Sequence, residues 1–231
     1  MLDVNTLHYG DNLEVLRDRD RFPSASVDLV YLDPPFNSDR GYNVIFKTHE
    51  GAGASAQIQA FDDTWAWGDE AQAQYKELTE GSTLPHVADV AGALFKILGT
   101  SDLFAYLVMM LPRLVEMRRV LKPTGSLYLH CDPAASHYLK LALDAIFGPE
   151  NFRNEIIWKR SHGHNSAQRY GANHDTILFY GGSGTVTWNP IFQEYDRAYI
   201  DKHYRHIDAL GRRYKHENPT GAGVSTGVTG Q

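Results

Sequence analysis

The stretch SVDLVYLDPPFNS, residues 26–38, decides the fold of this chain. Its first half has the nearly continuous apolar character of a strand covered on both faces, which is typical of parallel sheets. The run stops at Asp33, Pro34, Pro35 and Phe36. Ligands of an open α/β sheet bind beyond the carboxyl ends of its strands. We therefore expect the Asp33 carboxylate, the Pro34 carbonyl and the Phe36 ring to lie at the functional edge.

The loop after this strand offers hydrogen-bond acceptors, because two consecutive prolines donate no backbone hydrogen bond. A carboxylate and a carbonyl can each accept one N–H of an –NH₂ group, while a ring stacks on the flat system that carries the amine. The exocyclic amine of a nucleobase fits this description. Two acceptors would offset the positive charge that develops on that nitrogen during methyl transfer, and the base would be flipped out of its duplex. The alternative is that DPPF is only a stiff turn.

Strand and helix patterns alternate along the rest of the chain, which indicates an α/β sheet with helices on both faces. Residues 37–68 are rich in Gly, Asn, Ser and Asp, and we expect a long loop there. The other expected elements are a strand at 7–9, a helix capped by Asp11 or Asn12, helices near 70–80 and 102–121, a turn and strand at 122–132, a helix at 133–148, and strands at 154–160 and 175–181.

Composition restricts the class of protein. The chain has 231 residues, a net charge of −6 and one cysteine, Cys131, which excludes an internal disulfide. Residues 1–150 hold 12 Lys and Arg against 21 Asp and Glu, while residues 151–231 hold 10 against 7, so an acidic body carries a mildly basic flank. Such a flank is compatible with a local DNA-binding face. No apolar run is long enough for a membrane helix and the N-terminus is unlike a signal peptide, so we expect a cytoplasmic protein.

The sequence resembles the β class of DNA amino-methyltransferases, which includes type III modification subunits and many adenine-specific enzymes. The resemblance rests on LHYGDNLEVL followed by SVDLVYLDPPFNS, on QAFDDTWAWGDEAQAQY, on the long segment from LPRLVEMRRVLKPTG to LALDAIFG, and on FRNEIIWKR followed by HDTILFY. It implies a Rossmann-like methyltransferase sheet with a permuted order of motifs. It also implies S-adenosylmethionine as cofactor and double-stranded DNA with a flipped base as substrate.

Position by position, the resemblance makes Asp33, Pro34, Pro35 and Phe36 the catalytic motif. It places Asp11, Asn12 and Asp33 near the cofactor. An Asp at the start of the motif is more usual for transfer to adenine N6, and N4-cytosine transfer is the alternative within the class. Transfer to cytosine C5 would need a nucleophilic Cys after a proline, whereas Cys131 follows a histidine.

The glycine-rich cofactor motif of this class, Phe-x-Gly-x-Gly, follows the catalytic loop in the permuted order, and the chain has no match to it. YGGSG at 180–184 has glycines but ends a strand with no helix after it. We therefore expect an N-terminal portion of a longer protein, with a catalytic domain at 1–188 and the truncated start of a target-recognition segment at 189–231. A DNA-binding module without catalytic activity is the alternative outside the class of enzymes.

Four further residues are candidates for DNA contact, since they flank or follow the expected strands in polar loops: Asn37, Lys159, Arg160 and Arg169. Ordinary solvated surface charge is the alternative for the three basic residues. His162 and His164 have no nearby Cys or carboxylate to complete a ligand set, so no metal is expected. A restriction subunit and a second copy of the chain are possible partners, and a membrane is not.

Overall fold

The structure is a computed structural model that describes residues 5–35, 41–44, 58–62, 65–81, 84–160, 168, 170, 173–192 and 194–216. Residues 41–44 and 58–62 are described by their backbone only. The chain divides into two compact units, residues 1–187 and residues 188–231, which are considered separately.

The first unit contains a four-stranded sheet, a two-stranded ribbon and five α-helices within the described ranges. Its elements in chain order are α1 (Asn12–Arg17), β1 (Val27–Leu32), β2 (Gly41–Val44), β3 (Ile58–Asp62), α2 (Asp69–Glu80), α3 (Pro85–Leu98), α4 (Asp102–Val120), β4 (Leu121–Cys131), α5 (Pro133–Phe147), the 3-10 helix η1 (Pro149–Asn151), β5 (Phe152–Lys159) and β6 (His174–Gly181).

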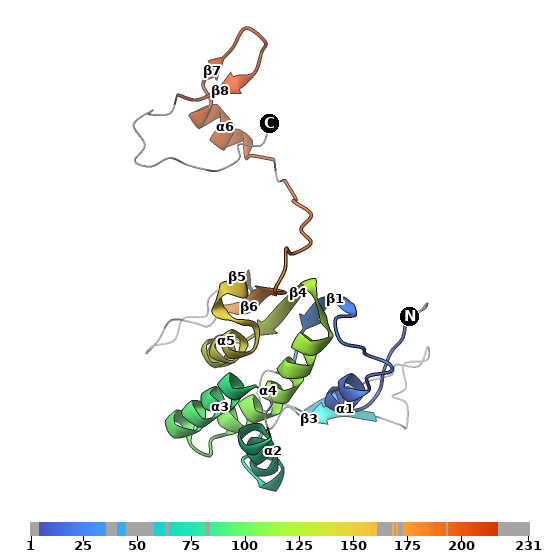
Figure 1. Cartoon of the computed structure of the whole chain (residues 1–231). Coiled ribbons are helices and arrows are strands. Elements are labelled where there is room, and N and C mark those ends of the chain that lie inside the picture. The colour runs from blue at the N-terminus through green and yellow to red at the C-terminus, as the bar shows by residue number, and fades with distance from the viewer. Residues whose placement is uncertain are drawn as a thin grey trace, which may run out of the picture. The chain divides into compact units, whose positions relative to one another are not determined.

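The order of strands in the main sheet is β1-β4-β6-β5. β1 runs parallel to β4, with Tyr31 opposite Tyr128 and Leu32 opposite Leu129. β6 is antiparallel to both of its neighbours, β4 and β5. Figure 1 shows the helices of this unit gathered on one side of the sheet. The predicted α/β sheet with helices packed on it is confirmed, and in the described part of the chain the helical layer lies on one face.

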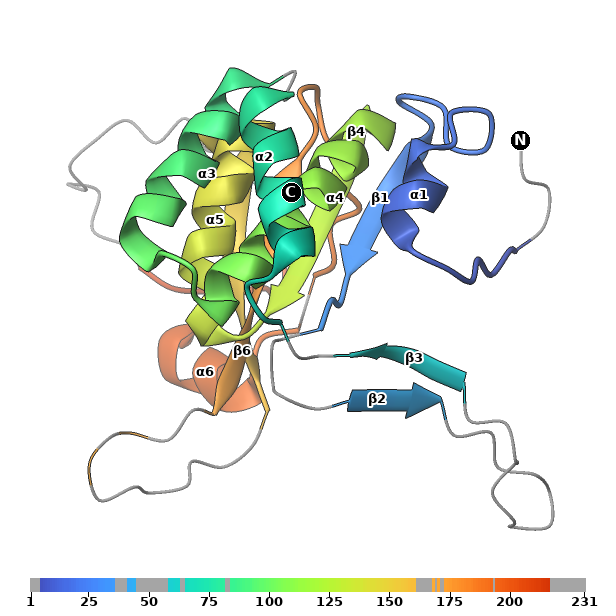
Figure 2. The same ribbon diagram turned by 90° about the horizontal axis from the view of Figure 1, so that it is seen from below.

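The hydrophobic core lies between that face and α4. Eleven residues of α4 are buried, and Phe104 and Tyr106 are completely inaccessible to solvent. Burial of one large apolar side chain contributes roughly 1.5–3 kcal/mol, and among the described elements this helix buries the most residues. Rings from three other segments, Trp67, Tyr75 and Phe95, surround Phe104 at centroid distances of 5.4–5.6 Å. Figure 2 shows α2 and α3 beside α4 and α5.

The opposite face of β1 is open in the described part of the chain. Val30 and Leu32 pack against the core, whereas Leu29 and Tyr31 are 59% and 56% exposed. Successive side chains of a strand point to opposite faces, so the exposed pair marks the face without helices. The apolar run of this strand predicted that both of its faces are buried. In the described part of the chain, one face is covered by the core and the other is exposed.

The connection between α1 and β1 is fixed by Arg119 at the end of α4. Its Nη2 donates to the Leu16 carbonyl at 2.6 Å and its Nη1 to the Phe22 carbonyl at 2.9 Å. The backbone N–H of Ala25 donates in return to the Arg119 carbonyl at 3.0 Å. These bonds fix the position of the chain just before β1. Because β1 has six residues, they also help to fix the position of Asp33 after its end.

Several predicted elements are confirmed. The helices expected near 70–80, 102–121 and 133–148 are α2, α4 and α5, and the expected strands at 154–160 and 175–181 are β5 and β6. Ser101 caps α4, with its Oγ accepting from the Phe104 N–H at 3.2 Å. Gly148 ends α5 with a φ of 86° and a ψ of 135°, and its N–H donates to the Asp144 carbonyl.

Other predictions are wrong. Residues 7–9 are not a strand, and Leu7 is 96% exposed, because three strand-forming residues without a pairing partner cannot hold an extended ladder. The segment 37–68 was expected to be one long loop, but β2 and β3 pair within it as an antiparallel ribbon. α3 was not predicted from the sequence. None of the helices in the described ranges is both long and apolar enough to cross a membrane.

The second unit contains a short helix and a two-stranded ribbon that were not predicted from the sequence: α6 (Arg197–His203), β7 (His206–Ile207) and β8 (Arg213–Tyr214). Asp208 closes the turn between the two strands. Its Oδ1 accepts from the N–H groups of Leu210 and Arg212, and its Oδ2 from the Arg212 side chain. These bonds from Arg212, first from its backbone and then from its side chain, lower the pKa of the Asp208 carboxyl.

We predict that Gly182→Ala destabilises the first unit. A Cβ at this position would lie 2.3 Å from the Pro123 carbonyl oxygen, in a place where the Gly182 N–H donates to the Gly125 carbonyl at 2.8 Å. The backbone must shift, and we expect a loss of about 1–3 kcal/mol in the free energy of unfolding by urea. Gly92→Ala in α3 is the matched control, because a Cβ there meets no atom within 4 Å. It should stabilise by about 0.5–1 kcal/mol; equal stability of the two variants would contradict the prediction.

Candidate active site

The end of β1 opens into a cavity of about 480 Å³. Its wall includes five of the residues predicted from the sequence as catalytic or cofactor-binding: Asp11, Asn12, Asp33, Pro34 and Pro35. Ligand sites in proteins commonly have volumes of about 300–1,000 Å³. The cavity therefore has the size of a site for a cofactor or a nucleobase, at the strand end where the sequence predicted one.

Arg113, in the middle of α4, organises the part of this wall that comes from α1. Its Nη2 donates to Asp11 Oδ1 at 2.8 Å, its Nε to Asn12 Oδ1 at 2.8 Å, and its Nη1 to the Met109 carbonyl at 2.7 Å. Asp11 Oδ1 also caps α1 by accepting from the Leu13 N–H. Both contacts of Asp11 are made at Oδ1, so Oδ2 remains available to a ligand.

The rest of the wall is mainly apolar and aromatic. Met109, Met110 and Met117 come from α4, and Trp65 comes from the segment before α2. The indole Nε1 of Trp65 is buried, and none of the described residues accepts its hydrogen bond. A buried N–H without an acceptor is unfavourable. The cavity thus combines a flat apolar wall with an unused donor and two carboxylates, a set of groups that suits a ligand with a polar aromatic base.

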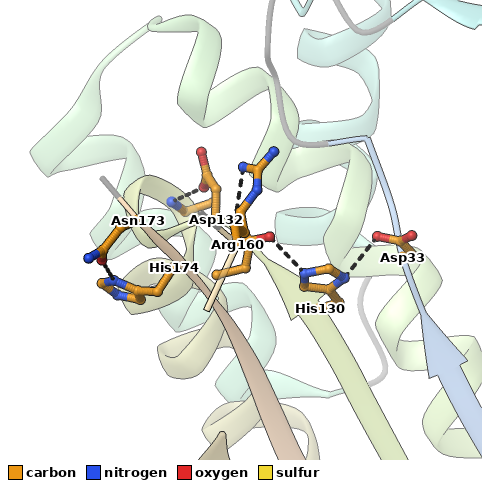
Figure 3. A network of polar contacts seen from close by, with 8 residues as sticks. Asp33, His130, Asp132, Arg160, Asn173 and His174 are labelled. Atoms are coloured by element: carbon orange, nitrogen blue, oxygen red, sulfur yellow. Dashed lines mark hydrogen bonds and ion pairs between the residues drawn. The ribbon is translucent and has the colours of Figure 1, made fainter. Parts of the chain in front are cut away.

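A chain of polar side chains in contact leads from Asp33 into the sheet (Figure 3). His130, near the end of β4, has its Nδ1 3.2 Å from Asp33 Oδ1 and its Nε2 3.1 Å from Asp175 Oδ2. Arg160, directly after β5, completes the chain with its Nη1 3.3 Å from Asp175 Oδ1. The ends of all four strands of the sheet, β1, β4, β5 and β6, therefore meet at the edge that carries Asp33.

Of the other predicted site residues, some lie outside the described part of the chain and some lie away from the cavity. Phe36, Asn37 and Arg169 lie outside the described residues. Lys159 and Arg160, predicted for DNA contact, lie at the exposed end of β5 and do not line the cavity. The guanidinium of Arg160 already pairs with Asp175, whereas Lys159 forms no ion pair with any described side chain. Neither position tests the predicted contact with DNA.

Sequence reasoning missed His130, Asp175 and Arg113 as site residues. His130 and Asp175 belong to segments that carry the resemblance, LYLHCDP and HDTILFY, but nothing within one segment shows that the two strands are neighbours. Arg113 is the first charged residue after an uncharged stretch of α4, residues 103–112. A charged residue inside such a pattern was the available signal.

Cys131 is structural. The side chain is completely buried, and burial first, then the charges of Asp132, Glu155 and Asp175, raise the pKa of its thiol from 9.0 to about 12. Because the thiolate is the nucleophilic form, this cysteine is inert in the folded protein. The glycines of YGGSG also have a packing role, since Gly182 and Gly184 donate backbone hydrogen bonds to the turn that begins β4.

Comparison with known proteins identifies the family. A family model described as DNA methylase matches residues 27–222. This is more than half of the chain, and the chain therefore belongs to the DNA methylase family.

Curated relatives agree with this assignment. The type III restriction-modification enzyme StyLTI Mod subunit of Salmonella typhimurium is 29% identical over 85% of this chain and 26% of that protein. The type II methyltransferase M.EcaI of Enterobacter cloacae is 28% identical over 98% of this chain and 40% of that protein. The EcoP15I Mod subunit of Escherichia coli is 25% identical over 74% of this chain and 23% of that protein. The chain thus spans well under half the length of these relatives.

Among solved structures, the complex of M1.HpyAVI with SAM covers 81% of this chain and 60% of that one, with 14% identity and a TM-score of 0.39. A score this low does not establish a shared fold. The fold class rests on the strands and helices described above.

We predict that Arg113→Ala destabilises the wall of the cavity. The Arg113 side chain is 12% exposed and its loss would leave the Met109 carbonyl, Asp11 and Asn12 without their common donor. We expect a decrease of about 1–3 kcal/mol in the free energy of unfolding, together with faster hydrogen exchange at the Leu13 amide. Arg17→Ala is the control, because the Arg17–Glu77 pair has a similar distance, 2.9 Å, but is 46% and 61% exposed. It should cost at most about 0.5 kcal/mol, and equal effects of the two changes would contradict the prediction.

The raised pKa of Cys131 predicts slow alkylation and a loss of stability at high pH. Iodoacetamide at pH 8.5 should modify the folded chain far more slowly than the chain unfolded in urea. The folded state holds the thiol proton more tightly than the unfolded state does. Ionisation of the thiol in the unfolded chain therefore lowers the free energy of unfolding as the pH rises. Stability from this group is thus constant below pH 9 and falls between pH 9 and about 12. Equal alkylation rates with and without urea would contradict the buried position.

Proposed function

We propose that the protein transfers a methyl group from S-adenosylmethionine to the N6 amine of adenine in DNA. The observation that carries this proposal is the position of Asp33 and Pro34 at the end of β1, on the wall of a cavity shared with Asp11 and Asn12. Membership in the DNA methylase family supports the reaction class. Relatives named as Mod subunits and type II methyltransferases support action within restriction and modification.

In this proposal Asp33 and the Pro34 carbonyl accept the two hydrogens of the target amine. As the nitrogen begins to form its bond to carbon it gains positive charge, which the Asp33 carboxylate offsets. Phe36 stacks on the flipped base and replaces part of the stacking lost from the duplex, worth about 1–3 kcal/mol. Catalysis by these residues consists of positioning and electrostatics, and needs no covalent intermediate.

The cavity fits the proposed cofactor. When bound, S-adenosylmethionine would supply a methyl group on a sulfonium, whose carbon–sulfur bond breaks on transfer to leave a neutral thioether. Asp11 Oδ2, Asn12 and the buried N–H of Trp65 are the polar groups available to its adenosine part, and the methionines of α4 provide apolar contacts. Arg113 keeps Asp11 and Asn12 in place with one hydrogen each of Nη2 and Nε, and a hydrogen of Nη1 goes to the Met109 carbonyl. The second hydrogens of Nη1 and Nη2 are the donors that it has left for a ligand.

The contacts to DNA are assigned to Asn37, Lys159, Arg160 and Arg169, which would bind phosphates and the neighbours of the flipped base. Lys159 is the best supported of these, since it is exposed and forms no ion pair with a described side chain. We further propose that residues 1–188 form the catalytic domain and that residues 189–231 begin the target-recognition segment. A restriction subunit or a second copy is the proposed protein partner, and the cytoplasm the proposed location.

We predict that Asp33→Asn in the full-length protein lowers methyl transfer by about 100- to 1,000-fold or more, because the amide cannot offset charge on the amine as a carboxylate does. DNA binding should change little. Asp28→Asn is the control: Asp28 lies on the same strand and is largely exposed, but pairs with Lys122 instead of facing the cavity. Methyl transfer is measured with labelled cofactor, and the methylated base is identified by mass spectrometry. Retained transfer by Asp33→Asn would refute the role of Asp33, and N4-methylcytosine as the product would replace the adenine assignment.

A further inference from the structure

His130 lies between two carboxylates that differ in their environment. The imidazole side chain is 17% exposed, Asp175 on its Nε2 side is 4% exposed, and Asp33 on its Nδ1 side is 63% exposed. Figure 3 shows His130 on β4 pointing toward Asp33 at the end of β1. The contacts therefore run from a buried carboxylate, through a mostly buried ring, to an exposed carboxylate at the edge of the cavity.

The buried side of the ring is fixed independently of Asp33. A buried carboxylate is tolerated only when charged or polar groups pair with it, and Asp175 has two such partners. His130 contacts its Oδ2 at 3.1 Å and Arg160 contacts its Oδ1 at 3.3 Å. The antiparallel ladder of β4 and β6, with His130 opposite Ile177, holds the two backbones together. The position of the ring is thus set by the sheet.

The Asp33 side chain, by contrast, has few constraints of its own. It follows the last residue of β1, and among the described side chains His130 is the one in ion-pair contact with its carboxylate. An exposed aspartate without such a contact samples several rotamers. The contact is made at Oδ1, which leaves Oδ2 free to accept a hydrogen bond from a ligand in the cavity.

We infer that His130 is a positioning residue, which holds the Asp33 carboxylate in one orientation through Nδ1 while Asp175 holds the ring through Nε2. This inference rests on the role proposed above for Asp33. One ring nitrogen faces each carboxylate, so the contact with Asp175 also fixes the direction of the nitrogen that faces Asp33. Because the Asp33 side chain is already oriented, less conformational entropy is lost when the target amine binds. A displacement of a reacting group by about 1 Å can lower the rate by up to about 100-fold.

Two substitutions at the same position separate positioning from structural support. In His130→Asn the amide nitrogen replaces Nδ1, so a donor remains near Asp33 while the contact with Asp175 is lost. In His130→Gln the amide nitrogen replaces Nε2, so the contact with the buried Asp175 remains while the donor near Asp33 is lost. The pair thus removes one contact at a time. Both are compared in the full-length protein by kcat, by KM for DNA and for S-adenosylmethionine, and by thermal unfolding.

If His130 positions Asp33, His130→Gln lowers kcat by about 10- to 100-fold with little change in either KM or in melting temperature. His130→Asn retains more of the wild-type kcat and loses more stability. A purely structural role gives the reverse order, with His130→Asn the less active variant in proportion to its lost stability. That order, or a wild-type kcat for His130→Gln, overturns the inference.

Asp175→Asn provides a second test if His130→Gln does not accumulate as folded protein. It preserves the volume of the side chain but removes the charge that holds the ring, so kcat should fall while DNA binding persists. A wild-type kcat for Asp175→Asn would then overturn the inference. Asp33→Asn, measured in parallel, keeps the two proposals apart. If Asp33→Asn retains transfer, the proposed function of Asp33 has failed; if Asp33→Asn is inactive while both His130 variants equal wild type, only the positioning role has failed.

Discussion

The parallel ladder between β1 and β4 determines which side chains meet at the end of β1. Tyr31 lies opposite Tyr128 and Leu32 opposite Leu129, so the two strands end side by side. The residue that follows Leu32 is Asp33, and the residue that follows Leu129 is His130. A shift of register by one residue would turn the side chains of β1 to the other face and separate the two groups. The contact between the exposed carboxylate and the ring is therefore a consequence of strand pairing.

α4 is the second constraint, because two of its arginines form hydrogen bonds with the segments that line or lead to the cavity. Arg119 fixes the loop that enters β1, and Arg113 fixes Asp11 and Asn12 at the start of α1. The same helix supplies most of the buried side chains of the core. Stability and site geometry thus depend on one element, and substitutions deep in α4 should affect both.

Much of the architecture could be predicted from local patterns. The apolar run ending at Asp33 and the helix patterns of α2, α4 and α5 each depend on neighbouring residues in the chain, and the structure confirms the elements they predict. The strand predicted at residues 7–9 is wrong, and the ribbon of β2 and β3 was missed, because a strand of a few residues exists only when another strand pairs with it. Pairing partners distant in the chain carry no local signal.

The sequence by itself determined which chemical groups follow the strand β1. Pro34 and Pro35 have no backbone N–H wherever the rest of the chain lies, so the segment after the strand presents the Asp33 carboxylate and the Pro34 carbonyl as acceptors. Only the tertiary structure decided what stands beside Asp33. His130, Asp175 and Arg160 come from three different strand ends, and Arg113 from a helix about 100 residues after the carboxylate it binds. Side chains so far apart in sequence are brought together by sheet register and helix packing, which depend on the whole fold.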